Sequence, residues 1–176
     1  MKIVVINGAP RSGKDTFVEL CRKFTGDAFL LNISTVDKVK EIATACGWDG
    51  TKTPENRKFL SDLKALLTDW ADVPLNDMIQ KIEKFKRELE YCELPDDRAI
   101  VFIHCREPEE IRKLVKALGA RTLLIRRAAA ENITASNQSD ARVFDYEYDI
   151  HINNNGSLAE LERTAELFIK STINLI

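Results

Sequence analysis

A glycine-rich segment near the start of the chain limits the fold more than any other feature. It spans residues 8–16, reads G-A-P-R-S-G-K-D-T, directly follows the apolar run 3–6 and opens a stretch with helical spacing. A strand that leads through such a turn into a helix can wrap around an anion, because Gly8 and Gly13 permit close approach and the amides entering the helix point at it. Lys14 adds a mobile positive charge for the outer phosphates. The segment therefore predicts a phosphate-binding loop and a nucleoside triphosphate site.

The loop departs from the common phosphate-loop pattern at one position. The pattern G-x-x-x-x-G-K-[ST] is kept through Lys14, but Asp15 stands at the hydroxyl position and Thr16 follows one place later. A carboxylate suits Mg²⁺, directly or through water, so we expect Asp15 and Thr16 to anchor the metal; a buried helix-cap role for Asp15 is the alternative. The loop residues expected to bind the nucleotide are Gly8, Arg11, Ser12, Gly13, Lys14, Asp15 and Thr16.

The overall composition fits one domain and argues against several classes of protein. The chain has 176 residues, which suits a single domain with a substantial core. It has 26 basic and 28 acidic residues and a net charge of -2, which argues against a general nucleic-acid binder or a membrane-surface protein. No apolar stretch is long enough to cross a bilayer, and the start lacks the features of a signal peptide, so we expect a cytoplasmic protein. The oligomeric state stays open, a homodimer included.

The cysteines are scattered along the chain and form no C-x-x-C pair. They are Cys21, Cys46, Cys92 and Cys105. We expect reduced thiols that pack in the interior, and neither a disulfide framework nor a zinc site.

Strand and helix patterns alternate along the chain. The predicted strands are 2–6, 29–31, 99–103, 122–125 and 148–152. The predicted helices are 14–24, 36–45 with Ser34 as N-cap, 54–70, 76–91, one that begins at 107–110 and ends at Gly119, and one that follows Ser157 with Leu158, Leu161, Ala165 and Phe168 facing inward. This alternation predicts an α/β fold in three layers, with a central parallel sheet of about five strands and helices on both faces.

Two segments interrupt the regular alternation. Residues 34–92 form a helical insertion between the second and third predicted strands, which either carries the acceptor site or is a solvated packing layer. Residues 128–141 are small and polar without long periodicity, which favours a mobile flap within a lid of about 126–142. A partly helical surface connection is the alternative for this second segment.

Arginines follow two of the predicted strands at the edge where open α/β sheets gather their ligands. Arg106 comes just after the third strand and is suited to hold a second phosphate in bidentate fashion, with a surface ion pair as the alternative. Arg126 and Arg127 end the fourth strand and Arg142 ends the flap, so these side chains could neutralise a phosphoryl group in transfer. The sequence does not choose between Arg126 and Arg127.

A general base is not evident from the sequence. His104 occupies the end-of-strand place where an acid often helps to hold magnesium, and we interpret it as structural rather than as a catalytic base. A phosphate acceptor makes a base unnecessary, because its attacking oxygen is already ionised near neutral pH.

Three motifs in the chain resemble those of one family, the P-loop kinases of the nucleoside monophosphate kinase type, especially deoxynucleoside monophosphate kinases and animal-type phosphomevalonate kinases. Residues 11–16 resemble the family's R-S-G-K-D-[TF]. Residues 104–111 resemble D-x-R-x-P-x-E-[IA], with His104 in place of the acid. Residues 152–161 resemble the closing I-x-N-x-G-[ST]-L-x-x-L.

The resemblance implies a P-loop NTPase fold, with ATP and Mg²⁺ as cofactors. It implies that Lys14 holds the transferred phosphate, Arg106 the acceptor's phosphate, and Arg126 with Arg127 the lid-side charge. The loop that contains Asn155 would lie against the adenine, and the insertion would bind the acceptor. The expected activity is transfer of the terminal phosphoryl group to a small phosphorylated acceptor, foremost a nucleoside or deoxynucleoside monophosphate. Another phosphorylated metabolite, or a nucleotide-binding module with degenerate catalysis, is the alternative.

Overall fold

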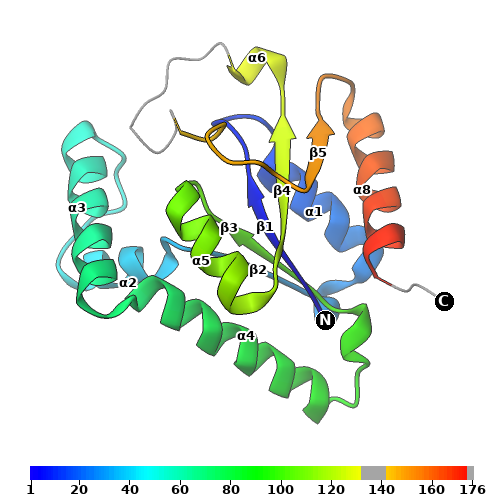
Figure 1. Ribbon diagram of the computed structural model, residues 1–176, viewed down its shortest axis with the longest axis horizontal. Helices are drawn as coiled ribbons and strands as arrows, with labels where there is room; N and C mark the ends of the chain where they lie inside the picture. The colour runs from blue at the N-terminus through cyan, green and yellow to red at the C-terminus, as the bar shows by residue number, and fades with distance from the viewer. Residues whose placement is uncertain (132–141, 174–176) are drawn as a thin grey trace.

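A parallel five-stranded sheet forms the centre of the computed structural model, which describes residues 1–131 and 142–173 (Figure 1). The strands run in the order β2-β3-β1-β4-β5, and every neighbouring pair is parallel. Their bounds are β1 Lys2–Asn7, β2 Leu30–Ser34, β3 Ile100–His104, β4 Arg121–Arg126 and β5 Ile150–Asn153. The predicted α/β class and parallel sheet are therefore confirmed. Most of the predicted flap lies outside the described residues.

Helices cover both faces of the sheet, so the predicted three layers are also confirmed. Helices α1 and α8 pack on one face, against side chains such as Ile6 and Phe102, while α4 and α5 pack on the other, against Val5 and Ile103. The helices are α1 Lys14–Thr25, α2 Asp37–Ala45, α3 Pro54–Ala71, α4 Val73–Tyr91, α5 Pro108–Leu118, α6 Ala128–Glu131 and α8 Leu158–Thr172, with short 3₁₀ turns at Asp27–Phe29 and Asp96–Arg98.

The strand β3 is the most completely buried part of the sheet. Ile100, Val101, Phe102 and Ile103 are all 0% exposed, as a strand covered by helices on both faces requires. It lies between β1 and β2, so the ends of β1 and β3 are adjacent, with Ile6 level with His104. This register brings the phosphate loop and residues 104–107 to the same edge of the sheet.

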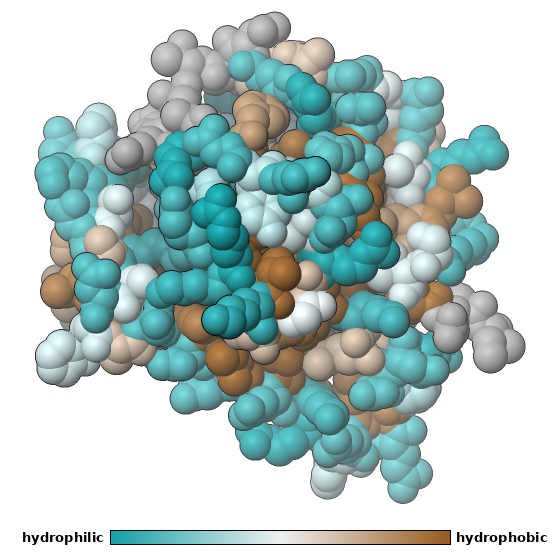
Figure 2. All heavy atoms as spheres, in the orientation of Figure 1, coloured by the Kyte–Doolittle hydropathy of each residue, from teal (hydrophilic) through white to brown (hydrophobic). Residues whose placement is uncertain are grey.

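The insertion between β2 and β3 consists of α2, α3 and α4, and these three helices pack differently. Helix α4 buries Met78, Ile82 and Leu89 against the sheet, whereas α3 has no buried residue and lies away from it in Figure 1. Apolar side chains on the face shown in Figure 2 gather between α4 and α5. Among the described residues, no helix is long and apolar enough to cross a membrane.

Several local predictions were wrong. Ser34 ends β2 and does not cap α2, which begins at Asp37 with Val36 as its N-cap; the Ser34 hydroxyl instead donates to the His104 carbonyl at 3.4 Å. Phe29 belongs to a 3₁₀ turn rather than to the strand. Leu158, in the first turn of α8, is 63% exposed rather than inward-facing, and the buried face of α8 begins at Leu161.

The cysteine prediction holds only in part. All four cysteines are free thiols, and Cys21 and Cys105 pack in the interior as expected. Cys46 and Cys92 are exposed, since each follows the last turn of its helix and lies outside the packed layer.

Candidate active site

The phosphate loop begins where β1 ends, at the middle of the sheet. Asn7 is the last strand residue, and α1 starts at Lys14 with Gly13 as its N-cap in the left-handed conformation, φ 92°. The Ser12 amide donates to the Ala9 carbonyl at 3.0 Å, which closes the turn. The first amides of a helix have no acceptor within that helix, so the start of α1 offers donors and a positive dipole end to an anion.

Close packing within the loop explains its first glycine. A Cβ on Gly8 would collide with Ser12 Oγ and would stand 2.7 Å from the Ile125 carbonyl oxygen. Ser12 Oγ is buried, and the described part of the chain provides it with no hydrogen-bond partner. A buried hydroxyl without a partner is costly unless a ligand satisfies it. The arrangement therefore fits a bound phosphate.

Lys14, Asp15 and Thr16 form the first turn of α1. The Lys14 side chain is only 13% exposed, so it is less open to solvent than expected for a mobile ligand group; its Nζ lies 3.7 Å from Asp15 Oδ1. The Asp15 side chain is 79% exposed, which rules out the buried-cap alternative. Asp15 and the exposed Thr16 offer oxygen donors of the kind that Mg²⁺ prefers. These two residues would hold the metal, which would neutralise phosphate charge.

His104 joins the ends of three elements. Its Nε2 lies 2.9 Å from the Asn32 side-chain oxygen on β2, and its Nδ1 lies 3.5 Å from Asp15 Oδ1 on α1. Burial lowers the pKa of His104, and this outweighs the nearby carboxylate of Asp15. A neutral imidazole held on both sides is consistent with the structural interpretation made from the sequence.

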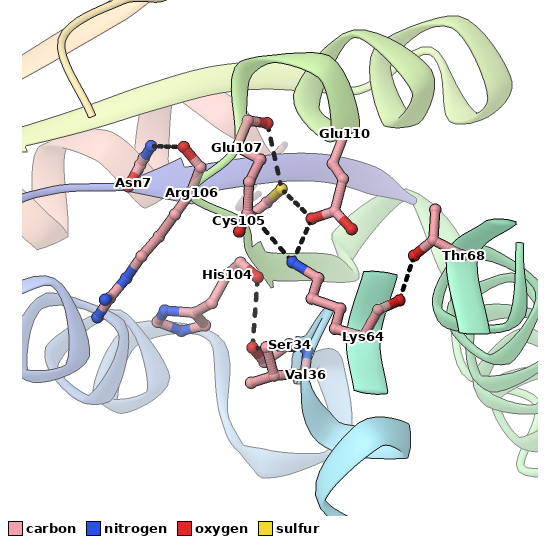
Figure 3. Close-up of polar contacts among 10 residues, drawn as sticks. All are labelled: Asn7, Ser34, Val36, Lys64, Thr68, His104, Cys105, Arg106, Glu107 and Glu110. Atoms are coloured by element: carbon pink, nitrogen blue, oxygen red, sulfur yellow. Dashed lines mark hydrogen bonds and ion pairs between the residues drawn. The ribbon is translucent and has the colours of Figure 1, made fainter. Parts of the chain in front are cut away.

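Residues Arg106 and Glu107 leave the end of β3 in different directions. In Figure 3 the Arg106 side chain extends on the side of His104, whereas Glu107 lies with the cluster formed by Lys64 and Glu110. The Arg106 carbonyl accepts a hydrogen bond from Asn7 Nδ2 at 3.3 Å. Arg106 is thus placed beside the phosphate loop, where a second phosphate could lie.

The cluster of Lys64, Glu107, Glu110 and Cys105 connects the insertion to residues 104–111, and sequence reasoning missed it. Lys64 Nζ, on α3, lies 2.7 Å from a carboxylate oxygen of each glutamate. Cys105 Sγ lies 3.4 Å from Glu110 Oε2. These acidic and sulfur atoms have metal-ligand spacing, but the Lys64 ammonium already contacts both carboxylates.

Burial dominates the pKa of Glu110 in this cluster, whereas charge attraction dominates that of Lys64. Burial raises the pKa of Glu110, although Lys64 pulls the other way. The pKa of Lys64 is raised as well, because attraction to the two carboxylates outweighs the effect of burial. A buried carboxylate with a raised pKa costs stability as the pH rises through that pKa.

We expect Lys64→Met to destabilise the fold by about 2 kcal/mol or more near pH 8, because it leaves two carboxylates without their cation. The loss should shrink towards pH 5, where Glu110 takes up a proton more readily than in wild type. Urea unfolding at several pH values measures both effects.

The matched control is Lys113→Met, which removes a solvent-exposed salt bridge to Asp72. This salt bridge also connects α5 with the insertion, because Asp72 directly follows α3. Lys113→Met should cost much less and show no such trend between pH 5 and pH 8. A Lys64→Met loss that is small or independent of pH would contradict the interpretation.

The arginines at the end of β4 are partly engaged by acids. Arg126 Nε and Nη2 donate to Glu131 on α6 at 2.9 and 2.8 Å, and its guanidinium lies over the Phe144 ring. Arg142 donates to Glu109 at 2.6 Å, while Arg127 is exposed. In this arrangement Arg126 braces α6.

The loop after β5 holds both the phosphate loop and α6. Asn154 Nδ2 donates to the Ser12 carbonyl at 2.8 Å, and the Asn154 amide donates to the Arg126 carbonyl at 2.7 Å. The side-chain oxygen of Asn155 accepts from the Ala128 amide at 2.7 Å. Sequence reasoning selected Asn155 and missed Asn154, although Asn154 stands at the asparagine position of the I-x-N-x-G motif over residues 152–156.

Comparison with known proteins gives distant structural likenesses only. No family model and no curated protein matches the chain. A gluconokinase from Sinorhizobium meliloti shares 16% identity, with a TM-score of 0.49, over 97% of this chain and 92% of that one. A shikimate kinase from Aquifex aeolicus shares 12% identity, with a TM-score of 0.49, over 96% of each chain. A dephospho-CoA kinase from Campylobacter jejuni shares 15% identity, with a TM-score of 0.49, over 98% of this chain and 97% of that one.

Proposed function

We propose that this protein is a Mg²⁺- and ATP-dependent phosphotransferase whose acceptor is a small phosphorylated molecule, foremost a nucleoside or deoxynucleoside monophosphate. The observation that carries the proposal is the loop itself, with left-handed Gly13, the buried Ser12 hydroxyl without a partner in the described chain, and Lys14 at the start of α1. These groups suit the outer phosphates of a nucleoside triphosphate. The three family-like motifs are in keeping with this activity.

The second part of the proposal concerns the acceptor. Arg106 follows β3, which is the direct neighbour of β1, so a phosphate bound by its guanidinium would lie close to one held by Lys14. A phosphate oxygen that is already ionised needs no base, and no base has to be assigned. The role of the site is then to position two phosphates and neutralise their charge.

The surrounding segments complete the proposal. The insertion of α2, α3 and α4 would bind the rest of the acceptor, the segment of about 126–142 would act as a lid, and Arg127, with Arg126 if released from Glu131, would add positive charge. The Asn155 loop would lie beside the nucleotide base. All of these belong to a single domain.

The test is a screen of the common ribo- and deoxyribonucleoside monophosphates for acceptor-dependent ADP formation from ATP, with and without Mg²⁺. A large rise in turnover with one monophosphate supports the proposal. If ATP raises the melting temperature but no monophosphate or other phosphorylated metabolite raises turnover, the nucleotide-binding module with His104 in place of the acid is the better description.

We expect Arg106→Ala to raise the KM for the acceptor by about 10- to 150-fold, through loss of charge-assisted hydrogen bonds. The KM for ATP should change little, because the arginine lies outside the loop. Steady-state kinetics with each substrate varied in turn measures the difference. Arg121→Ala is the control, because Arg121 begins β4 and so lies at the edge of the sheet opposite to Arg106. It should alter neither KM. An unchanged acceptor KM in Arg106→Ala would leave this arginine with a structural ion-pair role.

A further inference from the structure

A buried asparagine connects the phosphate loop with the acceptor-side element. Asn7 is 0% exposed and is the last residue of β1. Its side-chain oxygen accepts from the Gly8 amide at 2.8 Å, and its Nδ2 donates to the Arg106 carbonyl at 3.3 Å and to the Tyr148 hydroxyl at 2.7 Å. Both amide hydrogens and the oxygen are therefore used, which fixes the orientation of the carboxamide.

The tyrosine extends this connection to a third segment. Tyr148 is 5% exposed, and its hydroxyl donates to the carbonyl of Val143 at 2.8 Å. Burial raises the pKa of Tyr148, so the hydroxyl keeps its proton at physiological pH and can go on donating. Asn7 and Tyr148 thus join the start of the phosphate loop, the backbone of Arg106 and the chain at residue 143.

Packing alone does not require these polar groups. A phenylalanine at position 148 would fill the same space, and Asn7 follows four strand residues that are all apolar. Buried polar groups cost free energy unless every partner is present, but a fully satisfied network imposes a single geometry. Here the geometry that it imposes is the spacing between the two sites that would hold phosphates.

We propose that Asn7 and Tyr148 are positioning residues that set the place of Arg106, and hence of the acceptor phosphate, relative to the phosphate loop. The inference rests on the proposed function and deepens it. Phosphoryl transfer needs the attacking and leaving oxygens nearly in line, and a small misplacement costs a large factor in rate. The pair would act through the backbone of Arg106 without touching either substrate.

The test compares Tyr148→Phe with Tyr146→Phe, and adds Asn7→Ala. Tyr146 lies against Tyr148, with ring centroids 5.1 Å apart, so its variant is a matched control for loss of a neighbouring hydroxyl. We expect Tyr148→Phe to lower kcat/KM for the acceptor by about 10- to 100-fold and to leave the Kd for ATP within about twofold. Tyr146→Phe should change neither. Asn7→Ala should show the same acceptor-specific loss wherever it folds.

Amide hydrogen exchange keeps the inference separate from the proposed function. If wild type transfers phosphate to no acceptor, the proposed function fails, and exchange in the ligand-free proteins decides whether the pair fixes this segment. Tyr148→Phe should then speed exchange at residues 105–107 by about tenfold, and Tyr146→Phe should not. Equal exchange rates at residues 105–107 in the two variants would overturn the inference. So would a Tyr148→Phe protein that loses affinity for ATP as much as it loses kcat/KM for the acceptor.

Discussion

Replacing Lys14 with methionine is expected to lower ATP-dependent turnover by at least about 10³-fold, because it removes the positive charge that we propose binds the transferred phosphate. The side chain leaves the first turn of α1, and its Nζ lies beside the exposed carboxylate of Asp15, which would share the metal and phosphate environment. Methionine keeps the length of the apolar stem. The effect should therefore fall on the rate, and the melting temperature without ligand should change little.

The control for this experiment is Lys23→Met, on the same helix. Lys23 is more than half exposed and pairs with Glu162 on α8, away from the loop. Its variant should retain full turnover. Wild-type turnover in Lys14→Met, with the protein folded, would mean that the segment 8–16 does not bind the transferred phosphate.

Local sequence signals predicted the fold well wherever one element decides its own structure. The apolar runs at 3–6 and 99–103 became β1 and β3, and the Ser157 cap of α8 is present together with its reciprocal bond to Glu160. The errors occurred where a neighbour competes. Ser34 could have capped α2, but the strand continues through it and its hydroxyl donates to the His104 carbonyl.

The candidate site was predicted residue by residue, yet its connections were not. Asn154 and Ser12 are 142 positions apart, Asn7 and Tyr148 are 141 apart, and Lys64 meets Glu107 across 43 residues. Nothing in the spacing of one sequence indicates such pairs, because they arise only when the strands, helices and loops pack together: Lys64 lies on α3, and Tyr148 precedes β5. Types of residue at strand ends are readable from sequence, whereas their partners depend on the register of the sheet.

The engagement of Arg126 shows the same limit at short range. The sequence could not choose between Arg126 and Arg127, since neighbours on a strand point to opposite sides. Glu131, the last residue of α6, accepts from Nε and Nη2 of Arg126 and so engages that arginine. That bond depends on residues 128–131 being helical, which the sequence analysis offered only as the alternative to a mobile flap.

Gly13→Ala is expected to weaken ATP binding by about 100-fold and to lower the free energy of unfolding by about 2 to 4 kcal/mol. Two causes add at this position. An alanine at φ 92° is strained, and its Cβ would collide with Asn154 Nδ2. Asn154 would have to swing away and give up its bond to the Ser12 carbonyl, which would free the loop to change shape.

Gly47→Ala separates the two causes, because Gly47 has nearly the same backbone angle, φ 96°, and nothing within 4 Å of the added carbon. The Gly47→Ala protein should lose only the free energy of unfolding that backbone strain costs, about 1 to 2 kcal/mol, and its ATP affinity should not change. Calorimetric titration with ATP and urea unfolding of both variants measure the difference. Equal losses in the two proteins, with ATP affinity intact in Gly13→Ala, would show that Asn154 does not hold the loop in its binding shape.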